Sequence, residues 1–195
     1  MNEFIAIDFE TATESPDSAI SIGLVKYIDY KPAASYYSLI KPPVLFIRPD
    51  FTDIHGLTVD DVKDAPDFKY IWENELHEFF ETIPLAAHNA PFDMNVLRAV
   101  LLHYELTVPG TPYFCTLKLS RRVWPQLRSH ALAKLAKEFA ITYDAHNAVA
   151  DADTCAKIVL LGAEEITKKM KRKNIISLDG LLKKTGVELS LLNKF

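Results

Sequence analysis

The sequence predicts an α/β protein in which helices cover a mixed, five-stranded sheet. The first 40 residues contain three β-rich runs, and after Pro84 short apolar runs alternate with longer stretches of helical periodicity. Strands that come first and then alternate with helices are typical of a mixed sheet flanked by helices. The chain has 195 residues, of which 49% are hydrophobic, so we expect one domain with a substantial core.

The predicted strands are short runs rich in β-branched and aromatic residues. Residues 3–9 are apolar on both faces apart from an acid, which predicts a buried central strand. Residues 29–32 form a turn-like connection between the next two runs, so the first three strands should form a meander. The strands are expected at residues 3–9, 19–28, 35–40, 85–87 and 112–115.

The predicted helices begin at recognisable start signals. Thr58 followed by Asp61 resembles a helix-capping pair, and Pro91 suits the first turn of a helix. Residues 41–49 are rich in proline and predict a loop. The longer helices are expected at about residues 68–82, 91–105, 116–122, 130–139 and 148–171.

Composition favours a cytoplasmic protein that does not cross a membrane. We find no secretory signal pattern, and Cys115 and Cys155 lack the spacing of a zinc site or a disulfide framework. The net charge is −4, but residues 168–173 place five positive charges within six positions. This run can be a solvated helix end or a nucleic-acid contact. We expect residues 1–170 to form the domain and residues 171–195 a basic helical appendage, serving as a linker or a partner-binding tail.

Four carboxylates occupy positions where the pattern predicts a core. Because strand side chains alternate, Asp8 and Glu10 share one face of the first strand, about 7 Å apart along it. Asp93 is in register with the apolar stripe of its helix, and Asp151 begins the last long helix in a similar way. Any one such acid is better explained as a cap or an ion-pair partner, but four together require another explanation.

Clustered carboxylates in a partly dry site repel one another and would take up protons unless a cation compensates. Arg98 is predicted on another face of its helix, and no Lys or Arg occurs before Lys26. We therefore expect divalent metal ions. Ligands that are all oxygen favour Mg²⁺ or Mn²⁺ over zinc.

His146 lies five residues before Asp151, where it can reach the same site. Alone, such a histidine would more often be a surface or capping residue. Beside a metal-bound water it is a natural general base, since an unperturbed imidazole titrates near working pH.

Three segments carry these residues, and their order and spacing resemble the DEDDh branch of the 3′-to-5′ exonucleases. They are residues 7–11 (Ile-Asp-Phe-Glu-Thr), 88–93 (His-Asn-Ala-Pro-Phe-Asp) and 146–151 (His-Asn-Ala-Val-Ala-Asp). This group includes the proofreading (epsilon) subunit of bacterial DNA polymerase III. A sister branch has tyrosine at the position of Asn147, so the histidine branch is favoured. The resemblance covers about residues 3–165, although Cys115 stands where the family commonly has Asp.

The resemblance implies a ribonuclease H-like fold and a mechanism with two divalent metal ions. In that scheme Asp8 would bridge both ions, Glu10 and Asp151 would complete the site that activates water, and Asp93 would help to hold the second ion. His146 would take the proton of the water, and the product would be a nucleoside 5′-monophosphate.

The resemblance also implies where the substrate lies. The backbone of Thr11 and Ala12 and the side chains of Asn89 and Phe92 should lie beside the terminal nucleotide, although the Thr-Gly that follows the first motif in many relatives is absent here. A nucleic acid with a single-stranded 3′ end is therefore the expected partner, with DNA favoured over RNA, and the chain could be a DNA polymerase subunit. The alternatives are an RNA-trimming enzyme of the same superfamily and a non-catalytic nucleic-acid-binding or scaffold module. Two further histidines of these segments, His55 and His88, are expected to be structural.

Overall fold

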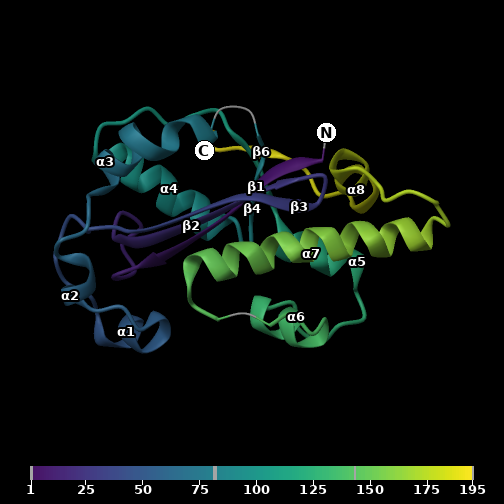
Figure 1. Cartoon of the computed structure of the whole chain (residues 1–195), viewed down its shortest axis with the longest axis horizontal. Coiled ribbons are helices and arrows are strands. Elements are labelled where there is room, and N and C mark those ends of the chain that lie inside the picture. Colours follow the sequence, from purple (N-terminus) through teal and green to yellow (C-terminus); the bar gives the residue numbers. More distant parts are fainter. Residues whose placement is uncertain (1, 81–82, 143, 195) are drawn as a thin grey trace.

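A mixed sheet with helices on both faces forms the centre of the protein (Figure 1). The computed structural model describes residues 2–80, 83–142 and 144–194. The six strands have the order β3-β2-β1-β4-β5-β6. Strand β2 is antiparallel to its neighbours β1 and β3, β4 and β5 are parallel to β1, and β6 is antiparallel to β5. The strands are β1 (Glu3–Thr11), β2 (Ala19–Ile28), β3 (Lys31–Leu39), β4 (Leu85–Ala87), β5 (Pro112–Cys115) and β6 (Ser190–Leu191).

The α/β prediction is confirmed, but the sheet has six strands where five were expected. The additional strand, β6, has two residues, which is too short for an alternating pattern to be visible in the sequence. It is defined by its pairing with β5, where Pro112 faces Leu191 and Tyr113 faces Ser190.

The helices begin close to the predicted signals. Thr58 and Asp61 form a capping box, and Pro91 lies in the first turn of its helix. The predicted helix at 68–82 is instead a short α-helix followed by π-helical and 3₁₀ turns as far as Phe80; residues 81 and 82 lie outside the described residues. The elements are α1 (Pro49–His55), α2 (Val59–Val62), α3 (Phe68–Ile71), η1 (Trp72–Leu76), η2 (His77–Phe80), α4 (Pro91–His103), α5 (Thr116–Val123), α6 (Leu132–Glu138), α7 (Ala148–Lys169) and α8 (Leu178–Thr185).

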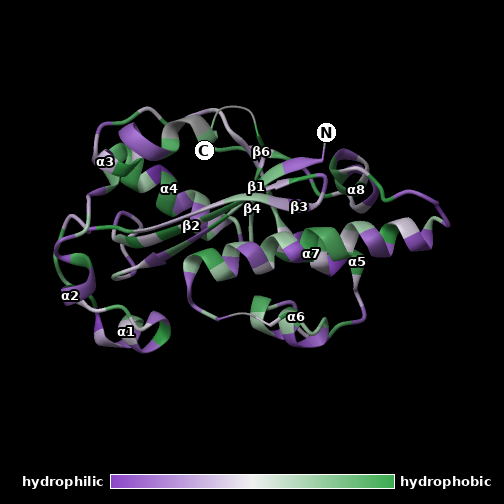
Figure 2. Ribbon diagram, in the orientation of Figure 1, coloured by the Kyte–Doolittle hydropathy of each residue, from purple (hydrophilic) through white to green (hydrophobic). Residues whose placement is uncertain are grey.

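The sheet separates two apolar cores. On one face α7 crosses β1 and β2 with its apolar side inward, as Figure 2 shows, and its core includes Phe4 and Ala6 of β1. The opposite core contains residues of α3 and α4 together with Ile5 and Ile7. Because β1 side chains alternate, Asp8 and Glu10 belong to the face that α7 covers.

The segment after α7 packs against the domain. The Tyr30 hydroxyl donates to the Ile176 carbonyl over 2.9 Å, and the Arg98 guanidinium donates to the Leu192 carbonyl over 2.9 and 2.8 Å. Residues 170–175 are exposed, and packing against the domain resumes at Ile176. None of the helices in the described ranges has the length and hydropathy that a membrane crossing requires.

Candidate active site

Three elements meet at the carboxyl end of β1: the strand itself, the turn between β4 and α4, and the first turn of α7. On β2, Gly23 lies directly opposite Asp8 in the antiparallel register. A Cβ atom at Gly23 would lie 2.2 Å from the carbonyl carbon of Ala148 and from the nitrogen of Val149. The absence of a side chain at Gly23 thus allows the start of α7 to lie directly on the sheet beside Asp8.

Asp93 enters the site from the first turn of α4 and is 1% exposed. The backbone N–H of Phe9 donates to Asp93 Oδ1 over 3.3 Å, which ties α4 to β1 between Asp8 and Glu10. The second oxygen, Oδ2, is buried without a hydrogen-bond partner among the described residues. A buried carboxylate oxygen without a partner is costly unless something else binds it.

The β4–α4 turn carries the two side chains that were expected to contact substrate. Asn89 has a left-handed backbone (φ 71°), and its carbonyl accepts a hydrogen bond from the Phe92 N–H over 2.9 Å. Both side chains are exposed, that of Phe92 to 46%. Phe92 therefore faces solvent beside Asp93 rather than packing on the sheet.

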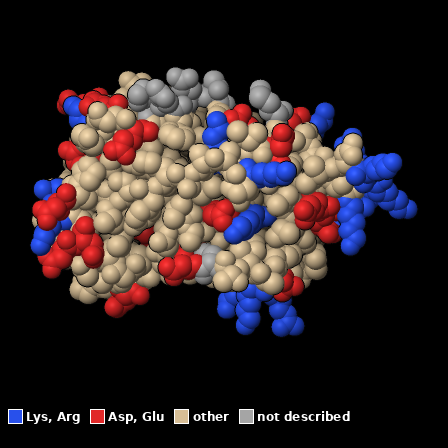
Figure 3. All heavy atoms as spheres, viewed as in Figure 1, with Lys and Arg blue, Asp and Glu red and all other residues tan. Residues whose placement is uncertain are grey.

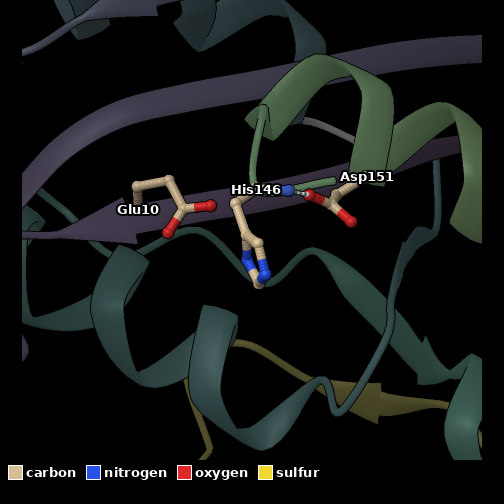
Figure 4. Close-up of side chains that lie close together, drawn as sticks. All are labelled: Glu10, His146 and Asp151. Carbon is tan, nitrogen blue, oxygen red and sulfur yellow. Dashed lines mark hydrogen bonds between the residues drawn. The ribbon is translucent and has the colours of Figure 1, made fainter. Parts of the chain in front are cut away.

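Glu10, His146 and Asp151 form the tightest group in the site (Figure 4). Each offers a ligand atom within 4.8 Å of those of the other two. The backbone of His146 is left-handed (φ 65°), and its N–H donates to Asp151 Oδ2 over 2.7 Å. The Asn147 side chain then caps α7 by accepting from the Ala150 N–H. This turn brings the histidine and the acid of the third motif to Glu10.

Burial raises the pKa of each of the four acids, and for three of them the charge of another acid in the group adds to the shift. Burial raises the pKa of Asp8 well above its usual value, and the charges of Asp93, Asp151 and Glu10 raise it further. Burial, together with the charge of Asp151, raises the pKa of Glu10 to about 8.

The pKa values of Asp93 and Asp151 are also raised. Burial raises the pKa of Asp93 well above its usual value, despite hydrogen bonds from the backbone. Burial also raises the pKa of Asp151, although the His146 N–H and charge oppose the increase. Over the described part of the chain, no Lys or Arg forms an ion pair with any of the four. Convergent oxygen ligands without a counter-charge fit divalent cations, so the donor set agrees with Mg²⁺ or Mn²⁺.

Thr11 and Ala12, the other residues expected to contact substrate, are buried at the end of β1. The Ala12 N–H donates to the Ser18 carbonyl over 2.8 Å, and the Ala12 carbonyl accepts from the Arg48 N–H over 3.0 Å. Both polar groups of the Ala12 backbone are thus already bonded within the protein. Ala12 also has no exposed surface, and Thr11 is 4% exposed.

The two histidines expected to be structural differ in position. His88 Nδ1 lies 3.0 Å from Thr116 Oγ1 and its Nε2 lies 2.8 Å from the His130 carbonyl, and burial lowers the pKa of His88 to about 4. His55 Nδ1 accepts from the Leu57 N–H over 3.1 Å. Burial lowers the pKa of His55, the Thr11 backbone opposes this shift, and the charge of His146 adds to it.

Comparisons with known proteins agree with this geometry. The exonuclease family model matches residues 5–159. The chain is 30% identical over 193 residues to a DNA polymerase III PolC-type protein of Caldanaerobacter subterraneus subsp. tengcongensis, covering 97% of this chain and 14% of that protein. It is 29% identical over 119 residues to the DNA polymerase III PolC-type protein of Streptococcus pneumoniae, covering 60% of this chain and 8% of that protein. The chain thus spans only a small part of the length of these relatives.

Solved structures share the fold. Exonuclease X in complex with 5′ overhanging duplex DNA has a TM-score of 0.68 and 23% identity, covering 94% of this chain and 99% of that one. The nuclease domain of 3′hExo, a DEDDh family member bound to rAMP, has a TM-score of 0.70 and 16% identity, covering 90% and 96%. The predicted resemblance and the ribonuclease H-like fold are confirmed by these matches.

Proposed function

The chain belongs to the exonuclease family, and from this premise we propose that it removes nucleotides from the 3′ end of a nucleic acid, DNA in preference to RNA. The products would be nucleoside 5′-monophosphates. One observation carries the proposal: Glu10 and Asp151 converge with His146, and the buried Asp8 and Asp93 interact electrostatically with them. No Lys or Arg in the described ranges pairs with any of these four acids. A scaffold would gain nothing from this costly arrangement.

Asp8, Glu10, Asp93 and Asp151 would hold two divalent ions, Mg²⁺ or Mn²⁺. The raised pKa values of the four acids and the unpartnered Oδ2 of Asp93 support this assignment. When bound, the ions would supply the positive charge that stabilises the attacking and leaving oxygens of an in-line displacement at phosphorus.

His146 would act as the general base. Its backbone N–H is held by Asp151, whereas its ring has no hydrogen-bond partner within the described ranges. In Figure 4 the ring extends away from that backbone hydrogen bond. A ring held by its backbone but free at its nitrogens can take a proton from an attacking water and release it to solvent.

Phe92 and Asn89 would position the terminal nucleotide. The Phe92 ring is exposed next to Asp93, so it can stack on a base or wedge between two bases. Asn89 is exposed at the tight turn that precedes α4, where its amide can donate to or accept from a sugar or base. Thr11 and Ala12, which are buried at the end of β1, would support the site from beneath.

Two observations favour DNA. The curated relatives described above are named as DNA polymerase III proteins, and the exonuclease X structure contains duplex DNA. The same relatives also support an association of this chain with a DNA polymerase. RNA is the second candidate substrate, because another solved neighbour is a 3′-exonuclease that recognises a histone mRNA stem-loop.

The test is digestion of 5′-labelled single-stranded DNA, duplex DNA and RNA of matched sequence, with Mg²⁺, with Mn²⁺ and with a chelator. We expect shortening from the 3′ end only with metal, and faster on DNA. Asp151→Asn should abolish it. The matched control is Asp153→Asn on the same helix, since Asp153 bonds the Tyr27 hydroxyl and Lys157 outside the site. Folded protein that shortens no substrate with either metal would overturn the proposal in favour of a binding module.

A further inference from the structure

A basic hollow of about 560 Å³ lies between α5 and the segment that follows α8. Its cations are Lys118, Arg121 and Arg122, all exposed on α5. Glu188 is the one acid that lines it, and none of the three cations forms an ion pair with any residue that the structure describes. The hollow therefore presents positive charge that no side chain of the protein neutralises.

Acidic and basic residues are unevenly distributed along the chain. Residues 1–110 contain seven basic residues (Lys and Arg) and 18 acidic residues (Asp and Glu), whereas residues 111–195 contain 15 basic and eight acidic residues. Figure 3 shows the consequence on one face: acidic groups gather around α1, α2 and α3, and basic groups gather near α6 and the far end of α7. A polyanion that approaches the site would be repelled from the α1–α3 side and attracted towards the helices of the second half.

The hollow is structurally connected to the active site. Helix α5 begins at Thr116, whose hydroxyl lies 3.0 Å from the ring of His88, the first residue of the motif that ends at Asp93. Arg121 is five residues further along α5, a rise of about 8 Å. Burial lowers the pKa of His88 and of His130, and the charge of Arg121 adds to both shifts. The ring of His130 also bonds to Ser120 on the same helix.

We propose that the basic hollow binds backbone phosphates of the nucleic-acid substrate, a few nucleotides away from the 3′ end that is cleaved. The inference rests on the proposed function, because it needs a polyanion whose end lies at the four acids. Arginine forks match phosphate oxygens in a bidentate geometry. Phosphate contacts position a strand without reading its sequence, so the hollow would align any strand for removal of its last nucleotide.

The experiment compares two double variants with the wild type. Arg121→Ala/Arg122→Ala removes two charges from the hollow. Arg172→Ala/Lys173→Ala removes two exposed charges from a different hollow, beyond the end of α7. The substrates are a DNA dinucleotide and a single strand of about 12 nucleotides, which spans about 40 Å at 3.4 Å per nucleotide. Binding of the labelled longer strand is measured in chelator, and hydrolysis of both in Mn²⁺, at several salt concentrations.

The hollow variant should weaken binding of the longer strand about tenfold at low salt, with a clearly smaller change in KM for the dinucleotide. Its slope of log affinity against log salt should fall by about 1.4, since each phosphate contact on a single strand contributes about 0.7. The control variant should change affinity less than twofold. Equal losses in both variants, or wild-type affinity and salt slope in the hollow variant, would overturn the inference. A wild type that binds the strand but cleaves neither substrate would refute the proposed function, and the binding comparison would still decide the hollow.

Discussion

Replacing Gly23 by alanine tests whether close packing of α7 on the sheet positions the active site. Gly23 lies opposite Asp8, and its missing side chain is what lets the backbone of Ala148 and Val149 approach. The new Cβ atom would lie 2.2 Å from both backbones and 2.4 Å from the Ala148 carbonyl oxygen. These neighbours are main-chain atoms, so no side chain can rotate to make room.

The size of the displacement follows from these distances. Ordinary van der Waals contact of a Cβ atom begins at 3.4 Å, so the first turn of α7 must retreat by more than about 1 Å. That turn carries Asp151 and is preceded by His146. A misplacement of about 1 Å costs about 100-fold in turnover, and overpacking of a core costs about 1–3 kcal/mol. We therefore expect kcat to fall about 100-fold while the protein remains folded.

The assay is metal-dependent hydrolysis of single-stranded DNA, with denaturant unfolding measured on the same preparation. Gly162→Ala is the matched control, because Gly162 also lies on α7 but an added Cβ would meet nothing closer than 3.6 Å. Helix propensity predicts that this control gains up to about 1 kcal/mol and keeps its turnover. Wild-type turnover in Gly23→Ala would refute the idea that close packing at this point aligns the acids.

Three other predictions concern the acids and the histidine. Asp8→Ala should abolish hydrolysis yet raise the free energy of unfolding of metal-free protein at pH 8, measured by urea denaturation, because it removes repulsion. The pKa of Glu10 rises from 4.5 to about 8 on folding, so the unfolded state loses this proton at lower pH than the folded state. The free energy of unfolding of metal-free protein should therefore fall as pH rises from about 4.5 to about 8. Glu10→Gln should reduce that fall, as measured by denaturation at a series of pH values. His146→Ala should lower kcat far more than Mn²⁺ affinity measured by calorimetry; an equal loss of both would make His146 a ligand rather than a base.

Much of the fold was predictable because its elements are local. The apolar run of β1 and the Thr58–Asp61 cap need only neighbouring residues to be recognised. The irregular winding after α3 was not predictable from the local pattern, which also fits a helix. It brings the rings of Trp72 and Phe80 to 5.0 Å, whereas a regular helix would separate these two residues by about 12 Å along its axis. Strand β6 likewise depends on distant partners, through the Leu192 N–H bond to the Thr111 carbonyl.

The acids of the site were predictable because carboxylates in apolar patterns are rare and costly. Gly23 was not singled out, although a lone glycine within a strand is the usual sign of a close backbone approach. The dense basic run at 168–173 was conspicuous in the sequence, yet it lies at the far end of α7 from Asp151. The cations of the basic hollow are separated in sequence from the residues around Glu188, so only the folded chain brings them together.

The basic hollow and the four acids lie apart because the former would bind phosphates and the latter divalent cations. A lysine or arginine placed among the four acids would pair with them, lower their pKa values and compete with divalent ions for the same oxygens. Basic side chains that bind phosphates must therefore lie at a distance from the acids, but no further away than the length of a few nucleotides of the bound strand. Arg121 meets both conditions: it forms no ion pair among the described residues, and it lies in the last turn of α5, whose final residue Val123 packs against Gly162, about 17 Å along α7 from Asp151. That separation exceeds the Debye length of about 8 Å at physiological salt, so the hollow can attract a strand without neutralising the site.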